Sequence, residues 1–252
     1  MRNIYVIAKN TFREAIRDRI LYAILGFGLV FILLDLFIAG LSLGDWVMIK
    51  SFGLAGIYIF GLIITIFLGS SIIYKEIERR TLYFVLSKPV SRRDLILGKF
   101  SGLFAAISLT TILMAAVYAA LILYVGGGFD YGGLLAVLFQ ILEQALFVAV
   151  LIFFSSVAAP LTATLCGTMI LFVGHLLTPV LANAKQIGGL IYKFILFLYY
   201  IFPNLEKFNL RNSVVHQIIP SFESILLIIG YALLYSVILL VAANILFGKR
   251  EL

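Results

Sequence analysis

Charged residues are scarce in this sequence, and so are the residue types that build disulfides and metal sites. Only 12% of the 252 residues are charged, whereas 63% are hydrophobic. A soluble domain usually has about a quarter charged residues. The single cysteine, Cys166, excludes an intramolecular disulfide, and one cysteine, two histidines and four methionines form no cluster of metal ligands. We therefore expect neither an ordinary soluble enzyme, nor a disulfide scaffold, nor a metal site.

Nucleotide-binding motifs are also missing. No GxxxxGK[ST] phosphate-binding loop and no HExxH zinc motif occurs in the sequence. We predict no catalytic residue and no cofactor on this chain. The formal net charge of +7 does not indicate nucleic acid, because basic residues in so apolar a chain mark cytoplasmic loops and lipid headgroups. The predicted partner of the surface is the lipid bilayer.

Six apolar stretches approach or exceed the roughly 20 residues that a membrane-spanning helix needs. They are residues 20–40, 52–74, 100–125, 134–158, 161–183 and 223–247. This pattern predicts an all-α polytopic membrane protein, with a single six-span domain over 20–252. The short uncharged connection at Pro160 predicts that spans four and five form a tight helical hairpin.

The basic residues predict the orientation of these spans. Segment 1–19 contains five, segment 75–99 seven and the C-terminal tail two, which makes 14 of the 19 Lys and Arg residues. Cytoplasmic loops are enriched in Lys and Arg. We therefore expect both termini and the 75–99 loop in the cytoplasm, and a multi-pass protein of a bacterial or archaeal plasma membrane.

The long connection 184–222 contains a further apolar patch, residues 187–202. This patch is shorter than a comfortable span, and Lys193 interrupts it. We interpret 184–222 as an extracytoplasmic segment whose patch is re-entrant or interfacial. A seventh span remains the alternative.

Segment 1–19 has the pattern of an amphipathic helix. An apolar stripe at four-residue spacing runs beside Lys9, Arg13 and Arg17; its members are Ile4, Ala8, Phe12, Ile16 and Ile20. A helix of this kind lies flat among the inner headgroups and turns into the first span as an elbow. It serves either as an anchor alone or as a contact for a cytoplasmic protein.

The segment from Tyr74 to Asp94 has features that a simple loop does not require. A charged helix leads into an apolar run, Leu82 to Leu86, and Pro89 ends it. Ser91, followed by an acidic residue three positions later, predicts an N-cap that starts the helix of the third span. We interpret this as a pair of short cytoplasmic helices that dock in a cleft of another protein; the alternative is a lipid-facing loop.

The sequence KEIERRTLYFVLSKPVSRRDLILGKF resembles the cytoplasmic loop of ABC-2-type permeases, the membrane subunits of ATP-binding-cassette transporters. The later stretch YYIFPNLEKFNLR, from Tyr199 to Arg211, is similar to the branch named for multicopper-enzyme maturation permeases. The resemblance implies coupling to an ATPase through the 75–99 loop. The implied coupling residues are Glu76, Glu78, Arg79, Arg80, Leu82, Leu86, Lys88, Pro89 and Arg92.

The resemblance also implies the partners. Two copies of the permease, either identical or paralogous, would pair with two copies of an ABC ATPase, which would bind ATP and Mg. The permease would form the translocation path, and the direction would be export. No part of this cycle would be catalysed by the present chain.

Polar residues within the spans are the remaining candidates. Gln140, Glu143 and Gln144 share one face of span four, which predicts a cargo pathway, a dimer seam or a helix–helix hydrogen-bond cluster. A gradient-driven carrier that uses Glu143 or Asp35 as its proton or ion site is the alternative function. Asp35 lies near a span end, so we expect its carboxylate near the level of the lipid headgroups. His175, in an apolar span, is expected to be a hydrogen-bonded filler.

Overall fold

The computed structural model describes residues 2–41, 46–70, 91–126 and 128–249, and in these it contains helices and no strand. Six helical segments are long and apolar enough to cross a membrane, which confirms the predicted all-α polytopic architecture. They are α2 with α3 (Arg19–Leu33 and Asp35–Leu41), α4 (Trp46–Ser70), α7 (Arg92–Tyr124), α8 (Tyr131–Val157), α9 (Pro160–Ile187) and α12 (Phe222–Lys249).

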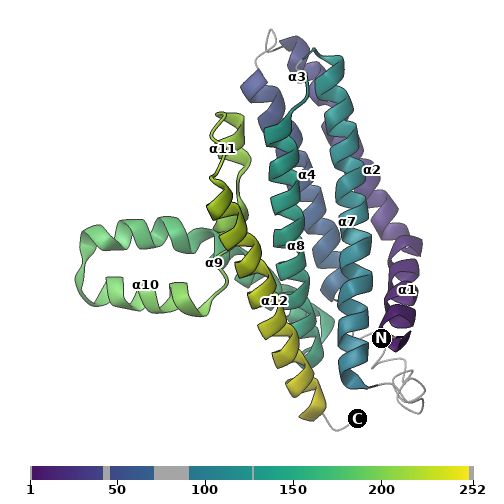
Figure 1. The fold of residues 1–252 in the computed structure, drawn as a ribbon, viewed down its shortest axis with the longest axis vertical. Helices are drawn as coiled ribbons and strands as arrows, with labels where there is room; N and C mark the ends of the chain where they lie inside the picture. Colours follow the sequence, from purple (N-terminus) through teal and green to yellow (C-terminus); the bar gives the residue numbers. More distant parts are fainter. Residues whose placement is uncertain (1, 42–45, 71–90, 127, 250–252) are drawn as a thin grey trace.

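Five of these six segments run along a common bundle axis, and α9 departs from it (Figure 1). We call the end where α1 and α7 begin and α12 finishes the terminal end, because both termini of the chain lie there. The opposite end, with α3 and the turn between α7 and α8, is the distal end. Helix α7 has 33 residues. At 1.5 Å per residue it is about 50 Å long, more than the ~30 Å of a hydrocarbon core, so it extends beyond the membrane.

The third span begins earlier than its apolar stretch predicts because its N-cap lies at Ser91. The Ser91 hydroxyl accepts a hydrogen bond from the backbone N–H of Asp94, at 3.1 Å, as the capping pattern predicts. Similarly, α8 ends at Val157 and α9 begins at Pro160, so the expected tight helical hairpin is present. Its proline occupies the first helical turn, where the missing N–H has no intrahelical partner to lose.

Helix α1 (Arg2–Arg17) packs lengthwise on the first half of α7. Gly98 and Gly102 allow this approach: a β-carbon on Gly98 would meet Ile7, and one on Gly102 would meet the backbone oxygen of Ala8. Thr11 and Ala15 are the most buried residues of α1, at 1% and 4% exposure. The predicted stripe is half-buried from Ile4 to Ile16, whereas Ile20 is exposed. Helix α1 is therefore amphipathic as predicted, and part of its apolar face packs on α7.

The elbow after α1 is produced by Asp18. This residue is extended rather than helical, and its carboxylate accepts a hydrogen bond from the backbone N–H of Ile20 at 3.0 Å. It therefore caps α2 while it separates the two helices. The predicted elbow between segment 1–19 and the first span is thus formed by the extended backbone and the capping side chain of Asp18.

Helix α8 lies at the centre of the bundle and contacts α4, α7, α9 and α12. Its most apolar stretch is 72% buried, the largest share among the six candidate spans. Leu146, Phe147 and Leu151 are completely buried there. Because most of α8 is covered by other helices, polar side chains on its buried faces are enclosed by the protein.

A lateral hairpin leaves the bundle at about its mid-height, formed by the end of α9 and by α10 (Gly189–Ile201) (Figure 1). The turn uses Gly188 and Gly189, both with positive φ, +70° and +66°, a conformation that glycine adopts without steric cost. No residue of α10 is buried. Its 13 residues extend about 20 Å, too short to cross a ~30 Å core. Whether this patch lies at an interface or re-enters the membrane stays a prediction.

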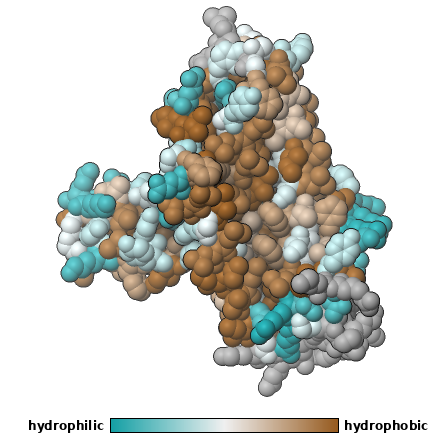
Figure 2. All heavy atoms as spheres, viewed as in Figure 1, coloured by the Kyte–Doolittle hydropathy of each residue, from teal (hydrophilic) through white to brown (hydrophobic). Residues whose placement is uncertain are grey.

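The chain then returns to the bundle through two short elements. The 3₁₀ helix η1 (Leu205–Phe208) packs against α8 and α9, and α11 (Arg211–Val215) packs against α4 and α8. Hydrophobic residues cover most of the bundle surface in the view of Figure 2, and hydrophilic residues gather near its ends, at its side edges at about mid-height and at the tip of the lateral hairpin. This distribution is typical of a bundle that sits in lipid.

Candidate functional site

The three predicted polar residues of α8 are all buried inside the bundle. Gln140, Glu143 and Gln144 are 4%, 1% and 0% exposed. The Gln140 side-chain amide donates to the backbone oxygen of Ile57 on α4, at 2.9 Å, and the Thr111 hydroxyl on α7 donates to Oε1 of Gln144, also at 2.9 Å. The two glutamines therefore form helix–helix hydrogen bonds. A role of this face in a cargo path or a dimer seam stays a prediction.

Glu143 is the centre of a network that joins three helices. Its Oε1 accepts a hydrogen bond from the Tyr58 hydroxyl of α4 at 3.1 Å and lies 3.0 Å from Nε2 of His175 on α9. The Tyr58 oxygen is 2.7 Å from the same His175 nitrogen. An ionisable group at membrane depth is costly unless it is paired, and this arrangement supplies the pairing.

The network continues from His175 toward the surface of the bundle. His175 Nδ1 lies 2.8 Å from Oε2 of Glu206 on η1, whose side chain is 34% exposed. Oε1 of Glu206 accepts a hydrogen bond from the Asn209 amide, and Asn209 in turn accepts one from Arg211, each at 3.0 Å. His175 thus bridges a buried carboxylate and a half-buried one. We call these two carboxylates, with His175 and Tyr58, the central network.

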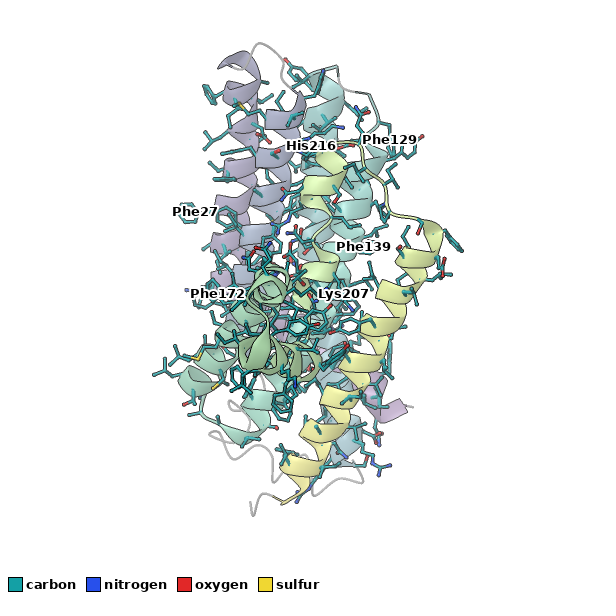
Figure 3. The ribbon with its side chains drawn as sticks, turned by 90° about the vertical axis from the view of Figure 1, so that its left-hand side faces the viewer. Phe27, Phe129, Phe139, Phe172, Lys207 and His216 are labelled. Atoms are coloured by element: carbon teal, nitrogen blue, oxygen red, sulfur yellow. The ribbon has the colours of Figure 1, made fainter. Side chains whose placement is uncertain are left out.

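Arg211 also contacts the central network, through the ring of Tyr58. Its guanidinium carbon lies 3.3 Å from the centre of the Tyr58 ring, a cation–π contact. Lys207 lies 4.4 Å from the centre of the Tyr231 ring on α12, and Figure 3 shows it at the mid-height of the molecule. His216, by contrast, lies higher in that view, near Phe129. His175, which contacts Glu206 beside Lys207, and His216 therefore lie in different regions of the molecule.

Sequence reasoning found Glu143 but not its partners. His175 was expected to be a hydrogen-bonded filler, and it is hydrogen-bonded, yet it also connects two acids on different elements. Glu206 and Tyr58 had no signal in the sequence, because neither shares a helical period with Glu143. Only the fold of the returning segment brings η1 next to α9.

A second polar cluster lies at the distal end. Asp130, in the turn before α8, accepts hydrogen bonds from Lys50 at 2.9 Å and from the Tyr118 hydroxyl at 2.7 Å. Burial of the Asp130 carboxyl raises its pKa, but the hydrogen bonds from Tyr118 and Lys50 outweigh this effect, so the net pKa lies below its ordinary value. The carboxylate is held ionised.

Asp35, at the start of α3, is 0% exposed, so it is enclosed by protein, and the expectation that it lies at headgroup level stays a prediction. A β-carbon on Gly53 would come within 2.7 Å of its Oδ2, so the carboxylate lies directly against α4. Neither of its oxygens has a hydrogen-bond partner within the described part of the chain. Asp35 is therefore a buried acid without the pairing that Glu143 has.

Eight of the nine predicted coupling residues lie outside the described residues: Glu76, Glu78, Arg79, Arg80, Leu82, Leu86, Lys88 and Pro89. The ninth, Arg92, begins α7. Its guanidinium donates to the backbone oxygens of Phe247 and Gly248 at 2.8 and 2.7 Å and lies 5.8 Å from the centre of the Phe247 ring. Arg92 therefore joins the start of α7 to the last turn of α12.

Residues 40–44, Gly-Leu-Ser-Leu-Gly, have the GxSxG spacing of the nucleophile turn in many hydrolases. That motif requires a strand before the serine, whereas the residues that precede it here form helix α3. It therefore gives no support to a hydrolase.

Among residues 2–41, 46–70, 91–126 and 128–249, no group of three or more His, Cys, Asp or Glu side chains is arranged to hold a metal ion.

Comparison with known families decides the class of the protein. Residues 41–252, well over half of the chain, match the family described as ABC-2 family transporter protein. The chain belongs to this ABC-2 family. No curated protein matches its sequence. Membership favours a permease over the gradient-driven carrier that Asp35 and Glu143 left open, while the more specific resemblance to maturation permeases stays a prediction.

Proposed function

We propose that this ABC-2 family protein is the membrane subunit of an ATP-driven exporter, and that it acts as a dimer with two separate ATPase chains. The observation that carries the proposal is the family match together with six candidate spans on a chain that has no GxxxxGK[ST] loop. ATP and Mg would bind to the partner ATPase. The chain itself would catalyse nothing.

The arrangement of the terminal end supports coupling at that end. Helix α7 begins there at Arg92, beside the last turn of α12, whereas α4 runs toward this end and finishes at Ser70, close to Asp18 and Leu21 at the elbow between α1 and α2. Arg92 and Arg93, at the start of α7, lie at this end, and the Lys and Arg content of segments 1–19 and 75–99 favours a cytoplasmic location in a bacterial or archaeal plasma membrane. An ATPase bound at the terminal end would contact segment 1–19 and the 75–99 loop.

Arg92 offers a route from this end into the bundle. Displacement of the start of α7 would act on α12 through the two hydrogen bonds to Phe247 and Gly248. Helix α12 packs along α8, which bears the central network. Motion that begins at the 75–99 loop would therefore reach the centre of the bundle through contacts between neighbouring helices.

Purification of the tagged chain from its native membrane in mild detergent tests this proposal. We expect a stoichiometric partner that contains a GxxxxGK[ST] loop, identified by mass spectrometry. Glu76→Gln and Pro89→Ala should retain folding but lower the ATP hydrolysis that the permease stimulates in its partner. Lys193→Gln, on α10, is the matched control and should leave that stimulation unchanged.

One result would contradict the proposal directly. If the purified chain moved cargo in response to an ion gradient with no ATPase present, the gradient-driven carrier would replace the permease. That carrier predicts pH-dependent transport that Glu143→Gln abolishes.

A further inference from the structure

A groove between α7 and α12 lies at the terminal end and is not part of the central network. Its volume is about 480 Å³, and its walls are formed by residues of these two helices. The apolar members are Ile96, Leu97, Val237, Leu240, Val241 and Ile245. The polar members are only Arg93 and Asn244.

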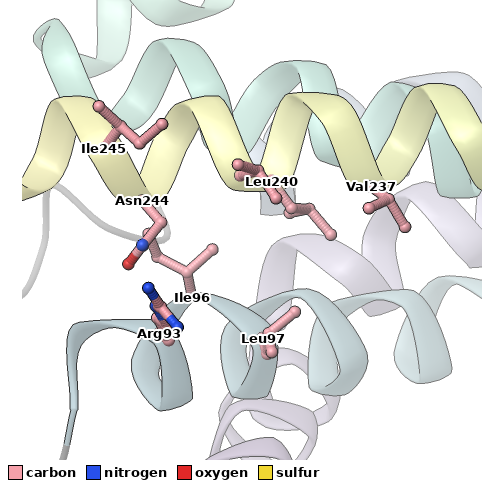
Figure 4. A pocket seen from close by; sticks show the side chains of 8 residues that line it. Arg93, Ile96, Leu97, Val237, Leu240, Asn244 and Ile245 are labelled. Carbon is pink, nitrogen blue, oxygen red and sulfur yellow. The ribbon is translucent and has the colours of Figure 1, made fainter.

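The polar and apolar members are separated along the groove. Figure 4 shows the side chains of Arg93 and Asn244 pointing toward each other at one end, with Leu97, Leu240 and Val237 farther along. On α12 the lining positions recur every three or four residues from Val237 to Ile245, so they form one stripe. Eight residues of helix correspond to about 12 Å, which is the length of this stripe along α12.

The groove is open to the surroundings of the bundle. Val237, Val241 and Ile245 are 57%, 52% and 52% exposed, and Leu97 is 40% exposed. In a membrane-spanning protein, such a surface meets lipid or another protein. No described acidic side chain forms an ion pair with Arg93, so its charge is available at the end of the groove.

We propose that this groove binds an anionic phospholipid of the inner leaflet. The acyl chain lies along the apolar stripe, and the headgroup phosphate binds Arg93 with Asn244 as a hydrogen-bond donor. A cation at one end of an apolar groove, in the first turn of a helix that begins at the terminal end, complements this amphipathic shape and charge. The inference does not depend on ATP hydrolysis or on the cargo.

Quenching of a tryptophan placed in the groove tests this site. The only native tryptophan, Trp46, lies at the distal end and is replaced by phenylalanine. Val241→Trp in this Trp46→Phe background places the reporter in the groove. The full-length protein is reconstituted in vesicles in which either phosphatidylglycerol or phosphatidylcholine has brominated acyl chains.

We expect the local preference of the reporter for brominated phosphatidylglycerol over phosphatidylcholine to be on the order of fivefold, as one basic residue near an anionic membrane provides. Arg93→Gln should reduce this preference to nearly onefold, and Arg93→Lys should retain most of it. Arg17→Gln removes an exposed arginine at the end of α1, outside the groove, and should leave the preference unchanged. Added glycerol phosphate, which has no acyl chain, should not compete.

Three results would overturn the site. One is equal quenching by both brominated lipids while Arg93 is intact, and another is a preference that Arg93→Gln does not change. The third is no quenching by either lipid, which would mean that protein, such as a second copy of the chain, covers the groove.

Discussion

The middle and the distal end of the bundle each contain a buried carboxylate, but only the one in the middle has hydrogen-bond partners among the described residues. Glu143, in the middle, is 1% exposed and has partners on α4 and α9. Asp35, at the distal end, is 0% exposed and has no hydrogen-bond partner among the residues that the structure describes. The difference shows that burial alone does not tell whether an acid is paired: Glu143 is fixed by its neighbours, whereas the burial of Asp35 has a cost that the surrounding fold must offset.

Asp130 sharpens this comparison because it is the neighbour of Asp35 at the distal end yet is paired. Tyr118 donates a hydrogen bond to Asp130, and the same ring lies against Gly53, where Asp35 also lies. The nearby cation, Lys50, bonds to Asp130. One cation thus stabilises one of two neighbouring acids.

The largest effect is expected for Glu143→Ala. This change removes an acceptor shared by Tyr58 and His175, and should destabilise the folded protein by about 2 kcal/mol, near the upper end for hydrogen bonds inside membranes. Reversible unfolding of the purified protein in mixed micelles measures the difference. Glu143→Gln keeps an acceptor oxygen for Tyr58 and is the control. Equal stability of the alanine and glutamine variants would contradict the pairing.

Asp35→Asn should have the opposite sign. Because neither carboxylate oxygen has a hydrogen-bond partner among the described residues, replacing a group that ionises by a neutral amide of the same size should stabilise the fold by about 1 kcal/mol. The same unfolding experiment measures it. A loss of stability comparable to that of Glu143→Ala would show that Asp35 has a partner after all.

Tyr58→Phe tests one contact of the central network without removing the acid. It deletes the hydroxyl that donates to Glu143 and lies 2.7 Å from His175, and it retains the ring under Arg211. We expect a loss of about 0.6 kcal/mol, the average for a hydrogen bond between membrane helices. Tyr124→Phe, on an exposed residue of α7, is the matched control and should change nothing.

The smallest effect is expected from Asp130 and appears only in acid. Its pKa is lower in the folded protein than in the unfolded chain, so its contribution to stability is complete above the ordinary aspartate pKa and is lost as the pH falls through the folded value. Stability measured from pH 6 downward should therefore fall less steeply in Asp130→Asn than in the unmodified protein. Identical slopes would contradict the stabilising role of Lys50 and Tyr118.

Much of the fold follows from local sequence patterns. Apolar length predicts the six spans, the Ser91 cap predicts where α7 begins, and Pro160 predicts the hairpin between α8 and α9. The three-and-four spacing of Gln140, Glu143 and Gln144 predicts their shared face. Each of these features depends on residues within a few turns of one helix, where the sequence pattern is sufficient.

Features that depend on distant contacts could not be predicted in the same way. His175 meets Glu206 because η1 returns to the bundle after the lateral hairpin, and no periodicity relates the two residues. The burial of Asp35 depends on the absence of a side chain at Gly53 on another helix. The close packing of α1 on α7 likewise depends on Gly98 and Gly102. These glycines leave room for another helix, but the sequence does not tell which helix packs there.

Site-specific cross-linking in the native membrane tests the central proposal, that an ATPase acts on the terminal end, most directly. Cys166 is the only cysteine, so Cys166→Ala provides a cysteine-free background. Ser87→Cys in that background places a cross-linker in the 75–99 loop, and Tyr131→Cys places one on an exposed residue at the distal end. We predict an adduct with an ABC ATPase from position 87 and none from position 131. No ATPase adduct from position 87, or equal adducts from both positions, would contradict the proposed coupling.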